Sequence, residues 1–216
     1  MSSGVKLEKE QKGAHLSRIV EVLNENLANK QISLDKFTEI IIKLSKRIES
    51  RNANLSLTFP ALIPTTSPVT NKESFIDSIV KLYIEIYKDQ ITKNISLKMD
   101  GAMCCPSSKK ISKYGAHSQR CSLITTILNC ENKVKIEDMS NIMQECFSSP
   151  VFSVIKREDE KYLTEKAYEN PKFSEDLIRD VLIKMKEKYS GYEIIAEMEN
   201  YESIHSHNVY AKGRIK

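Results

Sequence analysis

Apolar residues recur at helical spacing in four stretches of the chain. Residues 19–27 and 34–48 carry an apolar side chain at every third or fourth position, and the same spacing returns at 136–146 and 177–185. Ser33 stands directly before the second stretch, where a hydroxyl can accept a hydrogen bond from a free helix N–H group. The pattern predicts amphipathic helices, the second of which begins after Ser33.

Other stretches alternate apolar and polar residues, or are short apolar runs bounded by polar segments, which is typical of β-strands. A short polar segment separates two of them, at residues 88–90, and predicts the turn of an antiparallel hairpin. The predicted strands span residues 55–59, 80–87, 91–99, 121–128, 192–198 and 208–215.

Two segments lack a regular pattern, and we predict loops there. Residues 60–71 contain three prolines among several Ser and Thr. Residues 104–118 are polar and contain Pro106 and Gly115. Functional side chains are often placed on such loops by a rigid scaffold. The second loop begins with two adjacent cysteines, so it is the first place to look for a site.

The order of the elements is similar in the two halves of the chain, although no residue-level repeat is visible. We predict an α+β fold of two units, residues 1–88 and 89–216, each an antiparallel sheet with helices on one face. The first unit lacks an opening strand in this prediction.

Composition and charge narrow the class of protein. The chain has 216 residues with 40% hydrophobic content and no apolar run of about 18 residues, which argues against a membrane protein. Its start lacks the apolar core of a secretory signal, and its five cysteines are an odd number, so we expect a cytoplasmic protein with reduced thiols. A net charge of +4 suits a polyanionic small molecule as well as nucleic acid, so the charge alone does not decide between these partners.

A thiol and an imidazole flank the second predicted loop. Cys105 and His117 can approach each other if the chain turns back at the proline and the glycine between them, and with a carboxylate they would form a three-ligand set for a divalent metal ion. A buried cysteine and a solvated histidine are the alternative interpretation of the pair. The residue pattern leaves the carboxylate open between four candidates: Glu158, Asp159, Glu160 and Glu165.

Two further glutamates have an ordinary structural interpretation. Glu175 stands at the start of the last predicted helix, where a carboxylate is favoured by the helix dipole. Glu202 lies close to His205 and His207 in sequence and can orient either of them by hydrogen bonding.

Several motifs together resemble the type IB GTP cyclohydrolases and the related archaeal GTP cyclohydrolases. The motifs are KGAHLSR, SPVTNK, CCPSSKKISKYGAHSQRC, VIKREDEKYLTEKAYENPKFSED and ENYESIHSH, in that order. The resemblance covers roughly residues 12 to 212. It implies a tunnelling fold of two fused units, assembled as a homo-oligomer (a dimer or a tetramer) with active sites at subunit interfaces. His15 and Arg18 would then bind substrate in a neighbouring subunit's site.

The resemblance also implies a metal centre and a reaction. It places the metal ligands on Cys105, His117 and Glu160, with Zn, Fe or Mn as the single divalent ion. The implied reaction opens the guanine ring of GTP at C8, releases formate and gives 7,8-dihydroneopterin triphosphate, the first step of folate and pterin biosynthesis.

Roles for the other residues follow from the same resemblance. The purine would be anchored by Glu175, and the triphosphate would face Arg120 and Lys156. Besides Cys105, the catalytic residues would be His205, which transfers protons, and Glu202 beside it.

One position departs from the family pattern, and because of it alternative functions stay open. The family usually has a second cysteine where this chain has Ser107, with Cys104 as a possible substitute thiol. The alternatives are an archaeal-type enzyme that makes the cyclic phosphate, and a purine- or pterin-binding protein with weakened catalysis. We expect neither nucleic acid nor membrane as a partner.

Overall fold

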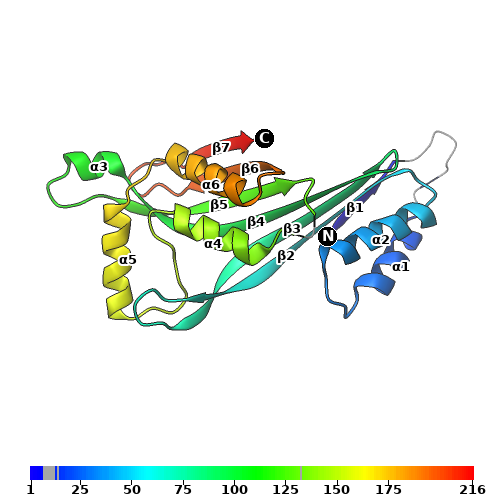
Figure 1. Ribbon diagram of the computed structural model, residues 1–216, viewed down its shortest axis with the longest axis horizontal. Helices are drawn as coiled ribbons and strands as arrows, with labels where there is room; N and C mark the ends of the chain where they lie inside the picture. The colour runs from blue at the N-terminus through cyan, green and yellow to red at the C-terminus, as the bar shows by residue number, and fades with distance from the viewer. Residues whose placement is uncertain (7–12, 14, 132) are drawn as a thin grey trace. The chain divides into compact units, whose positions relative to one another are not determined.

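Seven strands form one sheet in the computed structural model, which describes residues 1–6, 13, 15–131 and 133–216 (Figure 1). The strands follow one another in the sheet in chain order, and the pairs β1–β2 and β6–β7 are antiparallel. The strands are β1 (Ser2–Val5), β2 (Asn52–Thr66), β3 (Glu73–Tyr87), β4 (Gln90–Cys104), β5 (Ser118–Leu128), β6 (Glu193–Asn200) and β7 (Val209–Ile215). The helices are α1 (Leu16–Leu27), α2 (Leu34–Arg47), α3 (Pro106–Ile111), α4 (Ile136–Cys146), α5 (Arg157–Glu169) and α6 (Ser174–Lys188).

The chain divides into two compact units whose segments are interleaved. Unit 1 contains residues 1–59, 81–95 and 128–133, and unit 2 contains residues 60–80, 96–127 and 134–216. Strands β2, β3 and β4 contribute residues to both units, because each of them is 15 residues long. The sequence predicted a different division, into two repeated fold units with a boundary after residue 88. That division stays a prediction.

In unit 1 the two helices α1 and α2 pack against each other. The apolar stripe of α2 is fully buried at Phe37, Ile40 and Leu44, and the hydroxyl of Ser33 accepts a hydrogen bond from the N–H of Lys36 at 3.1 Å. The predicted helix and its cap are thus confirmed. A short strand, β1, precedes these helices and pairs with the start of β2, whereas two strands, β4 and β5, precede the helices α4 to α6; the prediction that the first unit lacks its opening strand stays a prediction.

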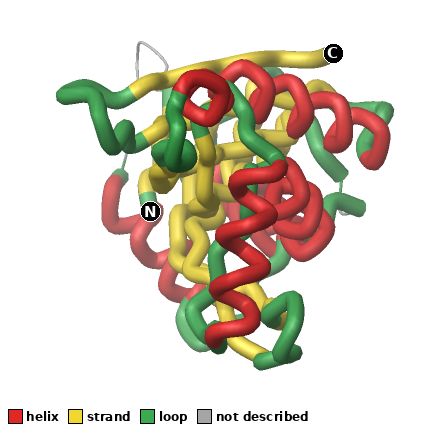
Figure 2. The backbone as a smooth tube through the Cα atoms, turned by 90° about the vertical axis from the view of Figure 1, so that its left-hand side faces the viewer, coloured by secondary structure: helices red, strands yellow, loops and turns green. Residues whose placement is uncertain are grey.

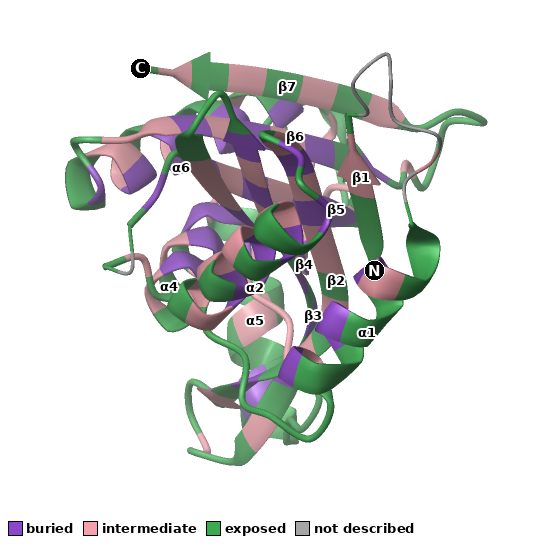
Figure 3. Ribbon diagram, turned by 90° about the vertical axis from the view of Figure 1, so that its right-hand side faces the viewer, coloured by how far each residue is buried: buried purple, intermediate pink, exposed green. Residues whose placement is uncertain are grey.

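In unit 2 helix α6 lies along β6 and β7, and α4 packs beside α6 (Figure 1 and Figure 2). The face of α6 toward the sheet is buried at Leu177, Val181 and Met185, as the helical spacing predicted. Buried residues gather on α6 and on strands β4 to β6 (Figure 3). This packed layer gives the site its rigid support.

Strand β2 continues through residues where a loop was predicted, although Pro60 and Pro64 lie within it. The carbonyl of Asn52 accepts a hydrogen bond from Lys6 on the β1 side, and backbone groups alternate in direction along a strand. Pro60 and Pro64 therefore face the same side as Asn52. Among the described residues, β1 pairs with residues 53–56 of β2, and both prolines lie outside this pairing, so neither is required to donate a hydrogen bond to β1.

The hairpin of β3 and β4 agrees with the predicted turn, since Lys88 and Asp89 both have positive φ, 48° and 68°. The predicted loop at 104–118 contains the six-residue helix α3, which is too short to show a periodic pattern. The charged segment after residue 156 forms α5. None of the helices in the described ranges is both long and apolar enough to cross a membrane.

Candidate functional site

Unit 2 has a cavity of about 280 Å³ that brings together predicted site residues from distant segments, and we call it the cysteine–histidine cavity. Its wall comes from the end of β4 with the start of α3, the start of β5, the start of α6, and the segment from β6 to β7. The residues that line it are Cys105, Pro106, His117, Gln119, Lys172, Phe173, Ser174, Glu175, Asn200, Glu202, His205, His207 and Val209.

Cys105 and His117 are held together by the backbone between β4 and β5. The N–H of Cys105 donates to the carbonyl of His117 at 3.1 Å, and the N–H of His117 donates to Oγ of Ser108 at 3.2 Å. Cys105 is also the N-cap residue of α3, where its Sγ accepts a hydrogen bond from the N–H of Ser108 at 3.4 Å. The turn of the chain that the sequence suggested therefore exists, and a short helix forms part of it.

A chain of polar groups orients the ring of His117. Its Nδ1 lies 2.8 Å from Oε1 of Gln119, and the amide Nε2 of Gln119 donates to Oε1 of Glu202 at 3.5 Å. Asn200 donates to the same carboxylate oxygen at 2.9 Å. Oγ of Ser203 also lies 3.2 Å from Nδ1. With the amide oxygen of Gln119 as its acceptor, Nδ1 would carry the proton and leave the lone pair of Nε2 available for a ligand.

The two histidines of the segment between β6 and β7 lie side by side. The rings of His205 and His207 stack with centroids 5.4 Å apart and planes at 24°, and both residues are exposed. The hydrogen bonds of Glu202 go to Gln119 and Asn200 rather than to either of these histidines. An orienting role of Glu202 toward His117, through Gln119, therefore replaces the role toward its sequence neighbours.

Glu175 is exposed in the first turn of α6 and borders the same cavity. An acidic side chain in the first turn of a helix is favoured by the helix dipole, as the sequence indicated. Its position on the cavity wall leaves its carboxylate accessible to a ligand as well.

A second cavity, of about 390 Å³, lies between α5 and the strands, and we call it the α5 cavity. Glu160 and Arg120 border it, and so do Cys104, Ala116 and Ser118, which are chain neighbours of the cysteine–histidine pair. Side chains of adjacent residues in extended segments point in opposite directions and thus serve two different cavities. The residues that line it are Ala102, Cys104, Ala116, Ser118, Arg120, Ser149, Pro150, Val151, Phe152, Ile155, Glu160, Leu163, Thr164, Ala167 and Tyr168.

Of the three predicted metal ligands, Cys105 and His117 are placed to bind one ion together, whereas Glu160 is not placed beside them. Cys105 and His117 offer a thiol and an oriented imidazole in one cavity, which suits a divalent ion. Within the ranges that the structure describes, however, no group of three His, Cys, Asp or Glu side chains is placed to hold one ion. Glu160 borders the α5 cavity instead.

Three further predicted residues line neither of the two cavities. Lys156 is the exposed N-cap residue of α5, and its backbone N–H donates to Asp159 at 2.9 Å. His15 and Arg18 belong to unit 1, where His15 is the N-cap residue of α1. Their assignment to substrate binding stays a prediction.

Cys104 does not share the cavity of Cys105, although the two are adjacent. It is buried, and burial raises the pKa of its thiol, while the charge of Lys109 lowers this pKa less. Ser107 is exposed on α3 and does not line the cysteine–histidine cavity. A substitute role of Cys104 for the missing second thiol therefore gains no support from this arrangement.

Sequence reasoning missed the polar residues that surround the pair, chiefly Gln119, Asn200 and Lys172. One signal was available for Gln119, because residues two apart in an extended segment point to the same side and Gln119 follows His117 by two. Asn200 bonds to Glu202, two positions further on, whereas the contacts of Lys172 with Cys104 and Cys146 join segments that are far apart along the chain, and no local pattern indicates those.

The sheet and its helices resemble solved structures of one fold class. The chain aligns with uricase from Arthrobacter globiformis at a TM-score of 0.52 and 7% identity, covering 93% of this chain and 74% of that one. It aligns with urate oxidase from Bacillus sp. TB-90 at 0.51 and 10%, covering 93% and 77%. At such identities the likeness concerns the fold alone, and the fold is the tunnelling fold predicted from the sequence.

The family follows from closer comparisons. The model of the family described as type I GTP cyclohydrolase FolE2 matches residues 1–211. GTP cyclohydrolase FolE2 of Geobacter sp. (strain M21) is 38% identical over 200 residues, which are 93% of this chain and 73% of that protein. GTP cyclohydrolase FolE2 of Fervidobacterium nodosum is 39% identical over 209 residues, 96% and 78%. The chain belongs to this family of GTP cyclohydrolases, which confirms the resemblance at the level of the family.

Proposed function

We propose that this protein is a GTP cyclohydrolase that hydrolyses the purine ring of GTP at C8. The observation that carries the proposal is the cysteine–histidine cavity, where Cys105, His117, Glu175 and His205 meet although they come from three separate segments. Family membership supplies the substrate, and the cavity supplies the residue types that the reaction needs. The type IB assignment and the product 7,8-dihydroneopterin triphosphate are part of this proposal.

In the proposed mechanism the chain's own residues bind the base and move protons. The carboxylate of Glu175 accepts hydrogen bonds from the N–H edge of guanine and so fixes the ring in the cavity. His205 belongs to the wall that a bound purine would contact and can transfer protons as the ring opens. Arg120 and Lys156 would interact with the triphosphate.

A divalent ion held by Cys105 and His117 would lower the pKa of water for attack on C8. Two observations support Cys105 and His117 as ligands. A thiol and an imidazole are groups that bind divalent metals, and the contact of His117 Nδ1 with Gln119 orients the imidazole. Glu160 is proposed as the third ligand on the family resemblance, and to complete the set its carboxylate would have to reach the ion from the α5 cavity. A thiolate, imidazole and carboxylate set accepts Zn, Fe or Mn.

The proposal is tested by incubating purified protein with GTP and each of these metals in turn. We expect formate, and a fluorescent pterin after oxidation. Cys105→Ala should abolish turnover and metal retention, whereas Cys130→Ala, which removes a thiol of unit 1, should retain both. Absence of formate with every metal would contradict the enzyme proposal. Treatment of the product with a phosphomonoesterase distinguishes the two possible products, because a linear triphosphate releases phosphate and a cyclic phosphate does not.

The second candidate function is a purine- or pterin-binding protein with weakened catalysis. Ser107 and the position of Glu160 in a different cavity from Cys105 favour it. Nucleotide binding without formate release would support it. Ser107→Cys separates the two further, since an increased rate would show that the missing thiol limits turnover.

We also propose that the protein forms a homo-oligomer. The support is the family resemblance, which implies active sites at subunit interfaces and assigns His15 and Arg18 to a neighbouring subunit's site. Light scattering measures the mass in solution, and a mass near the 24.7 kDa of one chain would contradict the proposal.

A further inference from the structure

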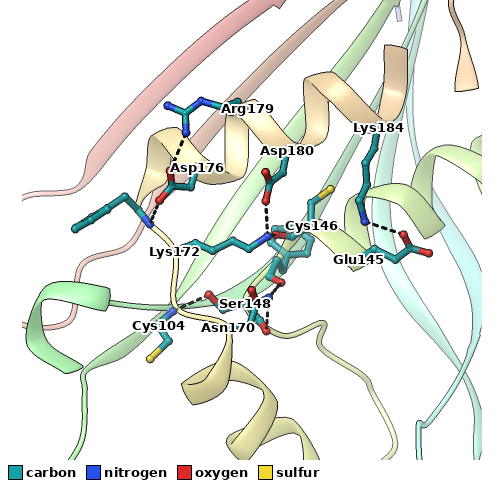
Figure 4. Close-up of polar contacts among 12 residues, drawn as sticks. Cys104, Glu145, Cys146, Ser148, Asn170, Lys172, Asp176, Arg179, Asp180 and Lys184 are labelled. Atoms are coloured by element: carbon teal, nitrogen blue, oxygen red, sulfur yellow. Dashed lines mark hydrogen bonds and ion pairs between the residues drawn. The ribbon is translucent and has the colours of Figure 1, made fainter. Parts of the chain in front are cut away.

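The backbone of Cys104 is fixed from two sides by parts of unit 2 that are distant in sequence. Its N–H donates to Oγ of Ser148 at 3.1 Å (Figure 4). Its carbonyl accepts a hydrogen bond from the N–H of Lys172 at 3.0 Å. Cys105 follows directly and is bound to His117 through its own N–H. The contact with Lys172 therefore joins the strand end that holds the cysteine–histidine pair to the connection between α5 and α6.

The ammonium group of Lys172 is bound among the helices of unit 2. Figure 4 shows it between two acceptors, the carbonyl of Cys146 at 2.9 Å and the carboxylate of Asp180 at 2.5 Å. The side chain is only 14% exposed, so its charge has lost most of its water and depends on these partners. Asn170 adds two hydrogen bonds to backbone carbonyls of the segment after α4.

Through Asp180 the same lysine is bound to α6, the helix that carries Glu175 in its first turn. Lys172 thus contacts both parts of the cavity wall, the end of β4 by its backbone and α6 by its side chain. Only three positions separate it from Glu175 along the chain. This double contact connects the cysteine–histidine pair with the helix that carries Glu175.

We propose that Lys172 is a positioning residue that sets the place of the purine anchor Glu175 relative to Cys105 and His117. The inference rests on the proposed function, since it concerns a base held at one end and attacked at the other. Displacement of a bound substrate by about 1 Å can cost on the order of 100-fold in rate. A loosened connection should therefore affect catalysis more than it affects folding.

The test compares Lys172→Met with Lys184→Met. Lys184 lies on the same helix α6 and binds Glu145 of α4 at 3.0 Å, so its loss also removes an ion pair from α6 but leaves the contacts of Cys104 intact (Figure 4). We expect kcat/KM for GTP to fall about 100-fold in Lys172→Met and less than about 2-fold in Lys184→Met. Lys172→Arg, which keeps a charged donor, should recover most of the loss.

Hydrogen exchange gives a readout that does not depend on turnover. In Lys172→Met the amides of residues 104–105 and 173–176 should exchange faster together, while Lys184→Met should change only the region around its own ion pair. Equal kcat/KM in the two variants, or unchanged exchange at residues 104–105, would overturn the positioning role. Failure of the wild-type protein to release formate would instead refute the proposed function, and the exchange measurement would still decide whether Lys172 couples the two segments.

Discussion

Asp159 accepts a hydrogen bond from the backbone N–H of Thr70 at 3.0 Å, although the two residues are 89 positions apart. The same carboxylate, which is fully buried, also accepts bonds from the N–H groups of Val69 and Lys156 and from the hydroxyl of Thr70. Burial raises the pKa of Asp159, but the hydrogen bonds from Thr70, Lys156 and Val69 together hold it below its usual range. This carboxylate attaches the β2–β3 loop to the start of α5.

Asp159→Asn should lower Tm by roughly 5 °C or more, because the new amide NH₂ group would face N–H donors and leave them without an acceptor. Glu158→Gln, an exposed neighbour on the same turn of α5, is the matched control and should leave Tm nearly unchanged. Thermal unfolding followed by circular dichroism measures both. A Tm of Asp159→Asn equal to that of the control would show that the loop is held by other contacts.

Gly101 has no room for a side chain. A Cβ at this position in β4 would overlap the ring of Phe147, which is fully buried. We expect Gly101→Ala to cost about 2–3 kcal/mol of unfolding free energy, since either the ring or the strand must move. Gly191→Ala, with no atom within 4 Å of its Cβ, should change it by less than about 0.5 kcal/mol. Urea unfolding of the two variants makes the comparison, and similar midpoints would contradict it.

Three buried thiols should make the protein sensitive to alkaline pH. Burial raises the pKa of Cys121 to about 12 and the pKa of Cys130 and Cys146 to about 11. In the unfolded chain a thiol loses its proton near pH ~8.5, so above this pH the unfolded state binds fewer protons than the native state. The free energy of unfolding should therefore be fully retained below about pH 8.5 and should fall as the pH rises from there toward the native pKa values.

The measurement is denaturant unfolding at about pH 7.5 and about pH 9.5, on either side of the unfolded-state pKa, for the wild type and for a variant in which all three thiols are replaced by alanine. The wild type should lose about 1 kcal/mol per thiol between the two pH values, and the variant should lose less. Equal losses would assign the effect to other groups.

Gln119→Leu tests the polar chain behind His117. Without the oxygen that accepts from Nδ1, the imidazole loses its fixed orientation, and the affinity for Zn should fall about 10- to 100-fold. Gln144→Leu removes a glutamine that bonds to Ser140 on α4, and its metal affinity should match that of the wild type. Titration with a competing chelator gives both values. If Gln119→Leu retains the wild-type affinity, His117 is held by other groups or is no ligand.

The helices and the long hairpin were predictable because their signals are local. The stripe of Phe37, Ile40 and Leu44 and the turn at Lys88 and Asp89 each lie within a short stretch of chain. The extension of β2 through its two prolines was not predictable, since it depends on the neighbours of that strand in the sheet. A pattern of residues along one strand does not show which neighbours the strand will have.

In the candidate site, too, local features were predictable from the sequence and long-range ones were not. The approach of Cys105 to His117 follows from a turn within one loop, and it was expected. The family resemblance supplied Glu160 as third ligand, and local pattern could not tell that Glu160 borders a different cavity from the pair. The role inferred for Lys172 depends on contacts with three separate elements, so it became visible only in the folded chain.

The prolines of β2 remove two backbone donors from one side of that strand. Pro60 and Pro64 both stand within the strand, and neither can donate a backbone hydrogen bond. A second strand laid along that side would find the hydrogen-bond ladder interrupted at both positions. The two residues that break the sequence pattern of a strand thus make this part of β2 a poor template for unwanted strand pairing.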